Sequence, residues 1–508
     1  MKSIRGKALS EIEDNIEYYG CTFHFQNNPL WLDKVKITNC LFDNCSFRDG
    51  GIAISHAANC RFTHCSFTDL VIDKQQDSVW QNCHAHHIRL ENITDPLSFL
   101  QDIQVSWLSL SNCYLKKIPT FQVKGVETLS ILRCRIDDVT NISSYRNLKK
   151  LCLRNSQIKN FVTKDKCEVT FLDLAHNQLS TFPQMEYFPN LRELNLSDNR
   201  IENLSTVKTN SCLEVLNLTK NKLRELPAEI KYFPHLRELN LYKNQIESFN
   251  ELTANSSLES LNLSRNKLRE LPMEIQHFPQ LKTLRLNCNY PLQKLAPQIS
   301  RLHDLEQLEL TDTKLAHLPG EMSKLENLRS LDLCGSCVEN LATICQITNL
   351  ENLYLGNSQI RNIEGISQLQ QLKLIDLIFS HFSEFPKEIC ALKNLEYLYI
   401  TSGHISEIPR EICQLSKLKH LEISDHQLKS LPAEMHEMAN LEYVDLEGND
   451  VKSLEEDIRR LGCSVKTYTE PDIPLRYLND DTDVDSDVFF IVDDDSPQEI
   501  LDVDDLEE

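Results

Sequence analysis

The chain has 508 residues, of which 41% are hydrophobic, and a formal net charge of −22 at pH 7. The excess of acidic residues argues against nucleic acid and anionic membranes as partners. The sequence has neither an apolar run long enough to cross a membrane nor an apolar signal segment at its N-terminus. Its 18 cysteines indicate buried, reduced thiols. We therefore expect a cytoplasmic protein, with a nuclear or host-delivered location as the alternatives.

The first 96 residues do not share the pattern of the rest of the chain. Residues 1–19 are mostly polar, and we expect a short helix there. From Val35 to Ile72 a small or aliphatic residue, one spacer and an aromatic or aliphatic residue recur every five positions through eight units. This form resembles the pentapeptide-repeat family. The resemblance implies a right-handed β-helix, which with its cap would occupy residues 20–96.

The recurrence also shows the length of one coil. Cys40 and Phe42 return 20 residues later as Cys60 and Phe62. Stacked coils would place such side chains in ladders about 4.8 Å apart.

One stretch of this segment, Asn82–His87 (NCHAHH), contains residue types that bind zinc. Neighbouring residues of a strand point to opposite sides, so these side chains cannot all converge on one ion. We expect no metal site here, and no cofactor elsewhere in the chain.

A second repeat dominates the remainder. Leu191–Leu204 (LRELNLSDNRIENL) reads Leu-x-x-Leu-x-Leu-x-x-Asn-x-Ile-x-x-Leu. A period of 20–29 residues with this spacing is typical of leucine-rich repeats, which the chain resembles. The resemblance implies a short strand with inward leucines in each unit. A sharp turn follows, at which the buried Asn bonds unpaired backbone groups. The first positions of sixteen repeats are Val105, Val126, Leu148, Val169, Leu191, Leu213, Leu236, Leu258, Leu281, Leu305, Leu328, Leu350, Leu372, Leu395, Leu418 and Leu441.

The longer repeats share a proline-containing segment after the strand. Leu226–Ile230 reads LPAEI and Leu271–Ile275 reads LPMEI. The proline is expected to begin a short helix on the convex side. This mixture of 22- and 23-residue repeats resembles the cytoplasmic phosphatase-regulatory and Ras-group types.

We therefore predict an α/β solenoid, a leucine-rich-repeat horseshoe with a concave parallel β-sheet over residues 97–469. A closing helix is expected at Leu454–Leu461, ended by Gly462. The short β-helix precedes this horseshoe. Residues 470–508 carry 16 acids against one base and form an acidic tail that we expect to be disordered.

The sequence contains no nucleophile–base motif, no phosphate-binding loop and no paired-carboxylate motif, so we expect a binding protein and not an enzyme. With the first Leu as position 1, positions 3, 5, 7 and 8 of each repeat face the concave side. Lys220, Lys243 and Arg265 share position 8 of three neighbouring repeats, with Arg285 nearby. They are either a dock for an acidic segment, such as the tail itself, or an ordinary solvated row.

A second group of outward residues is apolar and lies on the repeats that begin between Leu350 and Leu441. Exposed aromatic residues on adjacent strands are typical of binding hot spots. We predict a protein-binding site formed by Tyr354, Leu374, Ile378, Phe379, Tyr397, Tyr399 and Tyr443.

The tail holds two short apolar runs next to acids. They resemble SUMO-interacting motifs, which add a strand to a ubiquitin-like partner. Their apolar residues are Val488, Phe489, Phe490, Ile491, Val492, Ile500, Leu501 and Val503. The main expectation is a monomeric, non-catalytic scaffold or regulator that binds a protein on its concave face. The alternatives are an adaptor for a ubiquitin-like modifier and a regulator of a phosphatase or small GTPase.

Overall fold

The computed structural model describes most residues between Lys2 and Thr467. The residues outside the description are 1, 10–11, 14, 25–34, 49–51, 59, 73–74, 77–78, 82, 92–102, 116, 119–124, 208–211, 250–256 and 468–508. The chain folds into two compact units, the first over residues 1–156 and the second over 157–471. The predicted boundary at residue 96 lies inside the first unit, because strands on both sides of it pair with each other.

The first unit begins with strands where a helix was predicted. Ile16 and Tyr18 are buried, whereas Glu17 and Tyr19, which alternate with them, are half-buried, and this is the period of a strand. The Tyr18 ring stacks on Phe42 with 5.0 Å between ring centroids. The helix prediction for residues 1–19 is therefore wrong, because the core that this alternation faces comes from a later coil.

Five short strands of the first unit form one parallel sheet, in the order β1-β3-β6-β9-β12. They are β1 (Lys2–Arg5), β3 (Ile16–Tyr19), β6 (Leu41–Asp43), β9 (Arg61–Thr63) and β12 (Val79–Gln81). A second set of parallel strands consists of β2 (Ala8–Leu9), β4 (Thr22–His24), β5 (Val35–Thr38), β7 (Ser46–Arg48), β8 (Ile52–Ala58), β10 (Ser66–Ile72), β11 (Gln75–Gln76) and β13 (Cys83–Glu91).

Stacked phenylalanines fill the interior between these strands. Phe42 pairs in register with Phe62, and their rings lie 4.7 Å apart. Phe47 and Phe67 repeat the arrangement at 4.6 Å. The predicted 20-residue ladders are confirmed. The assignment to a right-handed, pentapeptide-type β-helix stays a prediction.

The parallel pairing continues from these coils into the first leucine-rich repeats. Strand β13 pairs with β14 from Cys83↔Ile103 to Glu91↔Ser111, and the His87 ring stacks on Trp107 at 4.1 Å. The remaining elements of this unit are β14 (Ile103–Ser111), β15 (Tyr114–Leu115), β16 (Thr128–Leu132), β17 (Arg135–Ile136), η2 (Thr140–Ser144) and β18 (Lys150–Cys152).

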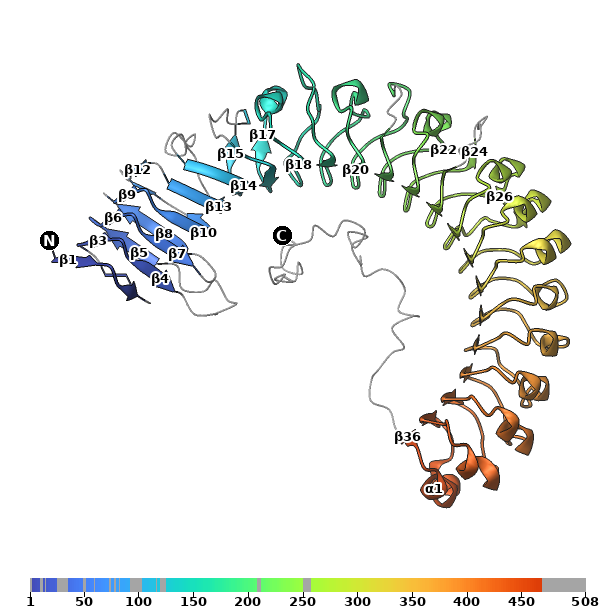
Figure 1. Cartoon of the computed structure of the whole chain (residues 1–508). Coiled ribbons are helices and arrows are strands. Elements are labelled where there is room, and N and C mark those ends of the chain that lie inside the picture. The colour runs from blue at the N-terminus through green and yellow to red at the C-terminus, as the bar shows by residue number, and fades with distance from the viewer. Residues whose placement is uncertain are drawn as a thin grey trace, which may run out of the picture. The chain divides into compact units, whose positions relative to one another are not determined.

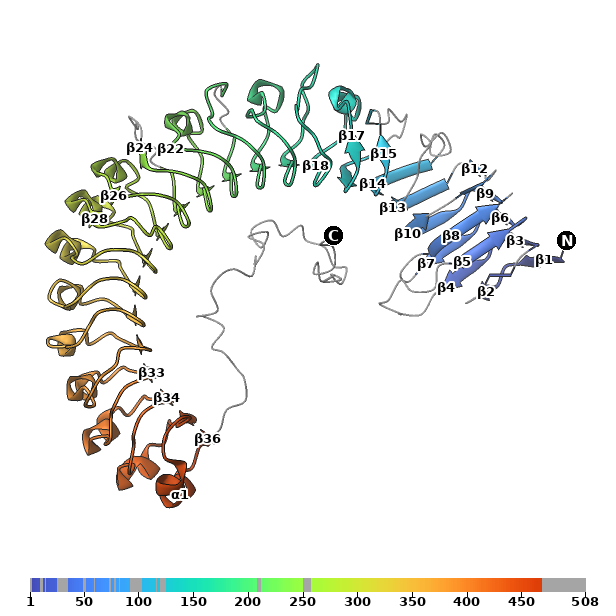
Figure 2. The same ribbon diagram turned by 180° about the vertical axis from the view of Figure 1, so that it is seen from behind.

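The second unit is the predicted leucine-rich solenoid. Its strands line the inner side of an arc and its short helices lie on the outer side (Figure 1), and the view from behind shows the same order (Figure 2). Each strand pairs with the next in parallel. The strands are β19 (Phe171–Asp173), β20 (Glu193–Asn195), β21 (Val215–Asn217), β23 (Glu238–Asn240), β25 (Ser260–Asn262), β27 (Thr283–Arg285), β29 (Gln307–Glu309), β30 (Ser330–Asp332), β31 (Asn352–Tyr354), β32 (Leu374–Leu377), β33 (Tyr397–Ile400), β34 (His420–Glu422), β35 (Tyr443–Asp445) and β36 (Ser464–Lys466).

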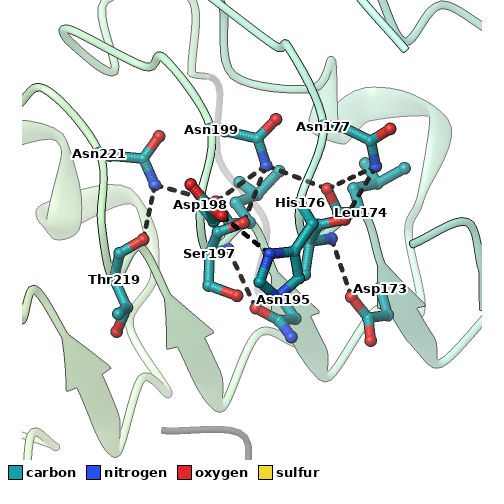
Figure 3. A network of polar contacts seen from close by, with 12 residues as sticks. Asp173, Leu174, His176, Asn177, Asn195, Ser197, Asp198, Asn199, Thr219 and Asn221 are labelled. Carbon is teal, nitrogen blue, oxygen red and sulfur yellow. Dashed lines mark hydrogen bonds and ion pairs between the residues drawn. The ribbon is translucent and has the colours of Figure 1, made fainter. Parts of the chain in front are cut away.

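In the repeats that have it, the asparagine at position 9 holds the turn, as predicted. The Asn199 carboxamide donates to the carbonyls of Leu174, Leu196 and Ser197 at 3.0–3.1 Å. Its oxygen accepts the N–H of Leu179 at 2.9 Å. Figure 3 shows Asn177, Asn199 and Asn221 in the same role on successive repeats. Each of these side chains therefore ties its own turn to the preceding repeat.

The return segments run along the convex side. The predicted prolines stand as N-caps immediately before 3-10 helices, as Pro227 does before η4. The 3-10 helices are η3 (Met185–Tyr187), η4 (Ala228–Tyr232), η5 (Met273–His277), η6 (Pro297–Arg301), η7 (Gly320–Lys324), η8 (Ile344–Gln346), η9 (Ile366–Gln368), η10 (Lys387–Ala391), η11 (Arg410–Gln414) and η12 (Ala433–Glu437). Four two-residue strands pair alongside them, β22 (Glu225–Leu226) with β24 (Ser248–Phe249) and β26 (Glu270–Leu271) with β28 (Lys294–Leu295).

The closing helix α1 (Val451–Arg460) begins three residues before its predicted start. The chain leaves it through an extended Leu461 and not through a left-handed Gly462, so the predicted glycine stop is wrong. That extended exit leads into β36, a last strand that the repeat pattern did not indicate.

Candidate interaction surface on the concave sheet

Parallel register aligns equivalent positions of neighbouring repeats into rows across the concave sheet. Strands β31 to β36 bring together a position-5 row, in which each residue pairs with the next. This row is Tyr354, Asp376, Tyr399, Glu422, Asp445 and Lys466. A parallel position-3 row runs through Leu374, Tyr397, His420 and Tyr443.

An aromatic cluster forms where the two rows run side by side. The His420 ring stacks on Tyr443 at 4.5 Å and lies 5.2 Å from Tyr399 and 6.4 Å from Tyr397. The structure thus brings together three of the predicted tyrosines. Sequence reasoning missed His420, although its place at position 3, between Tyr397 and Tyr443, was a readable signal.

The other predicted members are more dispersed. Tyr354 shares the position-5 row but is separated from Tyr399 by Asp376. Leu374 is half-buried and pairs with Tyr397. Ile378 is only 6% exposed, so its prediction as an outward residue is wrong. Strand β32 ends at Leu377, and the Ile378 N–H donates to the Asp376 carboxylate at 3.0 Å. Position 7 is buried in the next two repeats as well, at Thr401 and Ser424, so neighbouring repeats cover this row.

Phe379 is 43% exposed and has a φ of +56°, the left-handed conformation. A bulky side chain rarely adopts it, because its Cβ approaches the following carbonyl. Position 8 is left-handed throughout this stretch, and Gly335, Asn357 and Gly448 stand there in other repeats. An exposed aromatic residue at such a site is locally unfavourable.

Three carboxylates lie in the position-5 row beside the aromatic cluster. Those of Asp376 and Asp445 accept the N–H two residues later, at 3.0 and 2.9 Å, which is a structural role. Glu422 is longer and accepts from the Ser424 hydroxyl at 3.4 Å. Burial, and then the charges of Asp445 and Asp376, raises the pKa of Glu422 to about 7.

The charged residues at position 2, by contrast, form ion pairs with position 2 of the neighbouring repeat. Lys373 lies 2.6 Å from Glu351, and Lys419 lies 2.6 Å from Glu396. In the position-5 row Lys466 pairs with Asp445 at 3.5 Å and with Glu447 at 3.0 Å. Glu422 therefore lies in a row that holds two further carboxylates, those of Asp376 and Asp445.

The predicted basic residues occupy two different rows. Lys220, Lys243 and Arg265 follow one another at position 8, each with a positive φ. Arg285 is at position 5 and pairs with Glu309 at 3.2 Å. Asp198 precedes the basic row at the same position, paired with His176 at 2.8 Å, as Figure 3 shows. Docking of an acidic segment on this row stays a prediction.

Two further observations concern residues outside these rows. Cys334 and Cys337 have a Cys-x-x-Cys spacing that sequence reasoning overlooked; Cys334 is buried, and neither residue forms a disulfide within the described part of the chain. Of the zinc-type stretch, Cys83 is buried whereas His84 and His86 are exposed. The apolar tail residues predicted as a binding motif lie outside the described residues, and no helix within the described ranges is long and apolar enough to span a membrane.

Comparison with known families agrees with the repeat geometry. Family models match at 354–463 (leucine-rich repeat region), at 189–246, 211–268 and 279–336 (leucine rich repeat), and at 167–209 (leucine rich repeats, two copies). The chain contains leucine-rich repeats. These family models do not distinguish the cytoplasmic 22/23-residue type from other types of leucine-rich repeat.

Several known proteins are similar to this chain. A leucine-rich-repeat protein of Leptospira interrogans is 26% identical, with a TM-score of 0.51 over 73% of this chain and 92% of that one. A chain in the glycosylated Toll–Spätzle complex of Drosophila is 17% identical, with a TM-score of 0.52 over 72% of this chain and 61% of that one. A probable inactive serine/threonine-protein kinase of Dictyostelium discoideum is 27% identical over 116 residues. The match covers 21% of this chain and only 4% of that relative's length.

Proposed function

We propose that this chain is a non-catalytic scaffold or regulator that binds a protein partner on the concave face of strands β31–β35. The observation that carries the proposal is the ring array of Tyr397, Tyr399, His420 and Tyr443 on adjacent strands. Such clustered, half-buried aromatic side chains offer large contact area at a low cost in conformational entropy. Leucine-rich repeats commonly serve protein interaction, which supports the proposal.

The test is affinity capture with the intact chain and with two sets of substitutions. Replacing both Tyr399 and Tyr443 by Ser should release the main partner, since anchor residues contribute about 2 kcal/mol or more each. The matched control is Tyr290→Ser, which removes a tyrosine that is 59% exposed and lies outside the cluster. A partner that the double variant retains, or that the control also loses, contradicts the proposed site. Thermal unfolding of each variant separates lost binding from lost folding.

The tail-based adaptor is the alternative, and a chain that ends at Glu470 distinguishes it. A partner captured by the full chain and lost with this truncation would be bound through the tail. A partner kept after truncation but lost with the tyrosine variant would be bound by the concave face.

A further inference from the structure

The carboxylates beside the aromatic cluster indicate which kind of side chain a partner would place there. Tyr399 pairs in register with Asp376 on one side and with Glu422 on the other. Neighbouring strands are about 4.8 Å apart, so both carboxylates border the face that carries the ring. Burial first, and then the charges of Glu422 and Asp376, raises the pKa of Tyr399 to about 12. Burial is the main cause of the raised pKa of both Tyr399 and Glu422, and the neighbouring carboxylates act on both groups in the same direction.

We propose that the Tyr399–Glu422 pair, flanked by His420, is the receptor for an arginine side chain on a basic segment of the protein partner. The inference rests on the proposed function and adds the chemistry of recognition. A planar guanidinium can lie on a tyrosine or imidazole ring while its N–H groups donate to a carboxylate. A lysine ammonium supplies the charge but neither the plane nor the paired donors.

Charge decides against the other candidate occupant, the chain's own C-terminal tail. Residues 470–508 hold 16 acids and one base, so the carboxylates of Asp376, Glu422 and Asp445 repel them. The same carboxylates attract a basic segment. Lys466 is engaged at one end of the row with Asp445 and Glu447. Burial lowers the pKa of His420, so its ring is neutral at pH 7 and adds no competing cation.

The experiment measures binding of three small probes to the full chain by saturation-transfer NMR. They are the Nα-acetyl amides of arginine, of lysine and of citrulline, which has the shape of arginine without its charge. We expect arginine to bind best and citrulline at least about tenfold more weakly, because hydrogen bonds between charged groups are the strong ones. Glu422→Gln should lower arginine affinity about tenfold. Glu442→Gln, which removes an equal charge from an exposed glutamate of the next repeat, should change it less than about twofold.

Binding should also depend on pH with a defined sign. Glu422 faces Tyr399 on β33, Tyr443 and Asp445 on β35 and its own neighbours His420 and Ser424, with Asp376 and Lys466 further along the row. Because the cation requires the ionised Glu422, arginine affinity should fall up to about tenfold per unit below pH 7. Protonation of His420 at still lower pH acts in the same direction.

Several outcomes overturn the inference. They are the absence of arginine binding to the wild-type chain, equal affinity for citrulline, equal effects of the two glutamine variants, or an affinity that is constant between pH 8 and pH 6. If one of these occurs while the Tyr399 and Tyr443 variant still loses its captured partner, the proposed function stands and only arginine recognition fails. If capture is also insensitive to those tyrosines, both fail.

Discussion

At the scale of single residues, a buried asparagine at position 9 makes more hydrogen bonds than its size suggests. Asn221 donates to the carbonyls of Leu196, Leu218 and Thr219 and accepts from the N–H of Ile201. Asn221→Ala leaves these buried backbone groups without their side-chain hydrogen bonds and should reduce the free energy of unfolding by roughly 2–4 kcal/mol. Chemical denaturation measures this loss. Asn349→Ala is the control, because Asn349 is exposed and makes one side-chain bond to Glu326; a similar loss in both variants would contradict the explanation.

Glu422 gives a second prediction at this scale. Between its unfolded pKa of about 4.3 and its folded pKa of about 7, the native chain binds more protons than the unfolded chain. The contribution of this carboxyl to stability therefore declines as pH rises through that window. Glu422→Gln should raise the melting temperature at pH 8 and leave it unchanged near pH 4. A stabilisation independent of pH, or one matched by Glu442→Gln, would show that ionisation is not its cause.

At the scale of one structural element, the left-handed turn after β32 contains Phe379, and this conformation costs free energy for a bulky side chain. The backbone N–H of Phe379 donates to the Thr401 hydroxyl at 3.1 Å, a bond that any residue can make. Phe379→Asn should leave stability unchanged or raise the free energy of unfolding by up to about 1 kcal/mol, since Asn tolerates this conformation. The melting temperature should accordingly stay the same or rise. Partner binding should weaken, because an exposed aromatic ring is lost. A marked fall in the melting temperature would instead show that the ring packs as core.

At the scale of the whole molecule, the N-terminal coils cover the first leucine-rich repeats. Strand β13 is in register with β14 along eight residue pairs, and the His87 ring nitrogen lies 2.9 Å from the Ser109 hydroxyl. Deleting residues 1–95 exposes the edge of β14 and the buried Leu108 and Leu110, so solubility and melting temperature should fall together. Thermal unfolding and light scattering measure both. An unchanged melting curve would make the coils an independent appendage.

The sequence by itself determined the repeat architecture, the inward leucines and the asparagine turns, because each of these follows from a pattern that recurs along the chain. Only the tertiary structure decided that strands form within residues 2–19, that Ile378 is buried and that β36 ends the sheet. It also placed Glu422 beside Tyr399 and His420 beside Tyr443. These contacts join residues about one repeat or more apart, so the burial and the pKa of each group depend on the side chains that neighbouring repeats place around it.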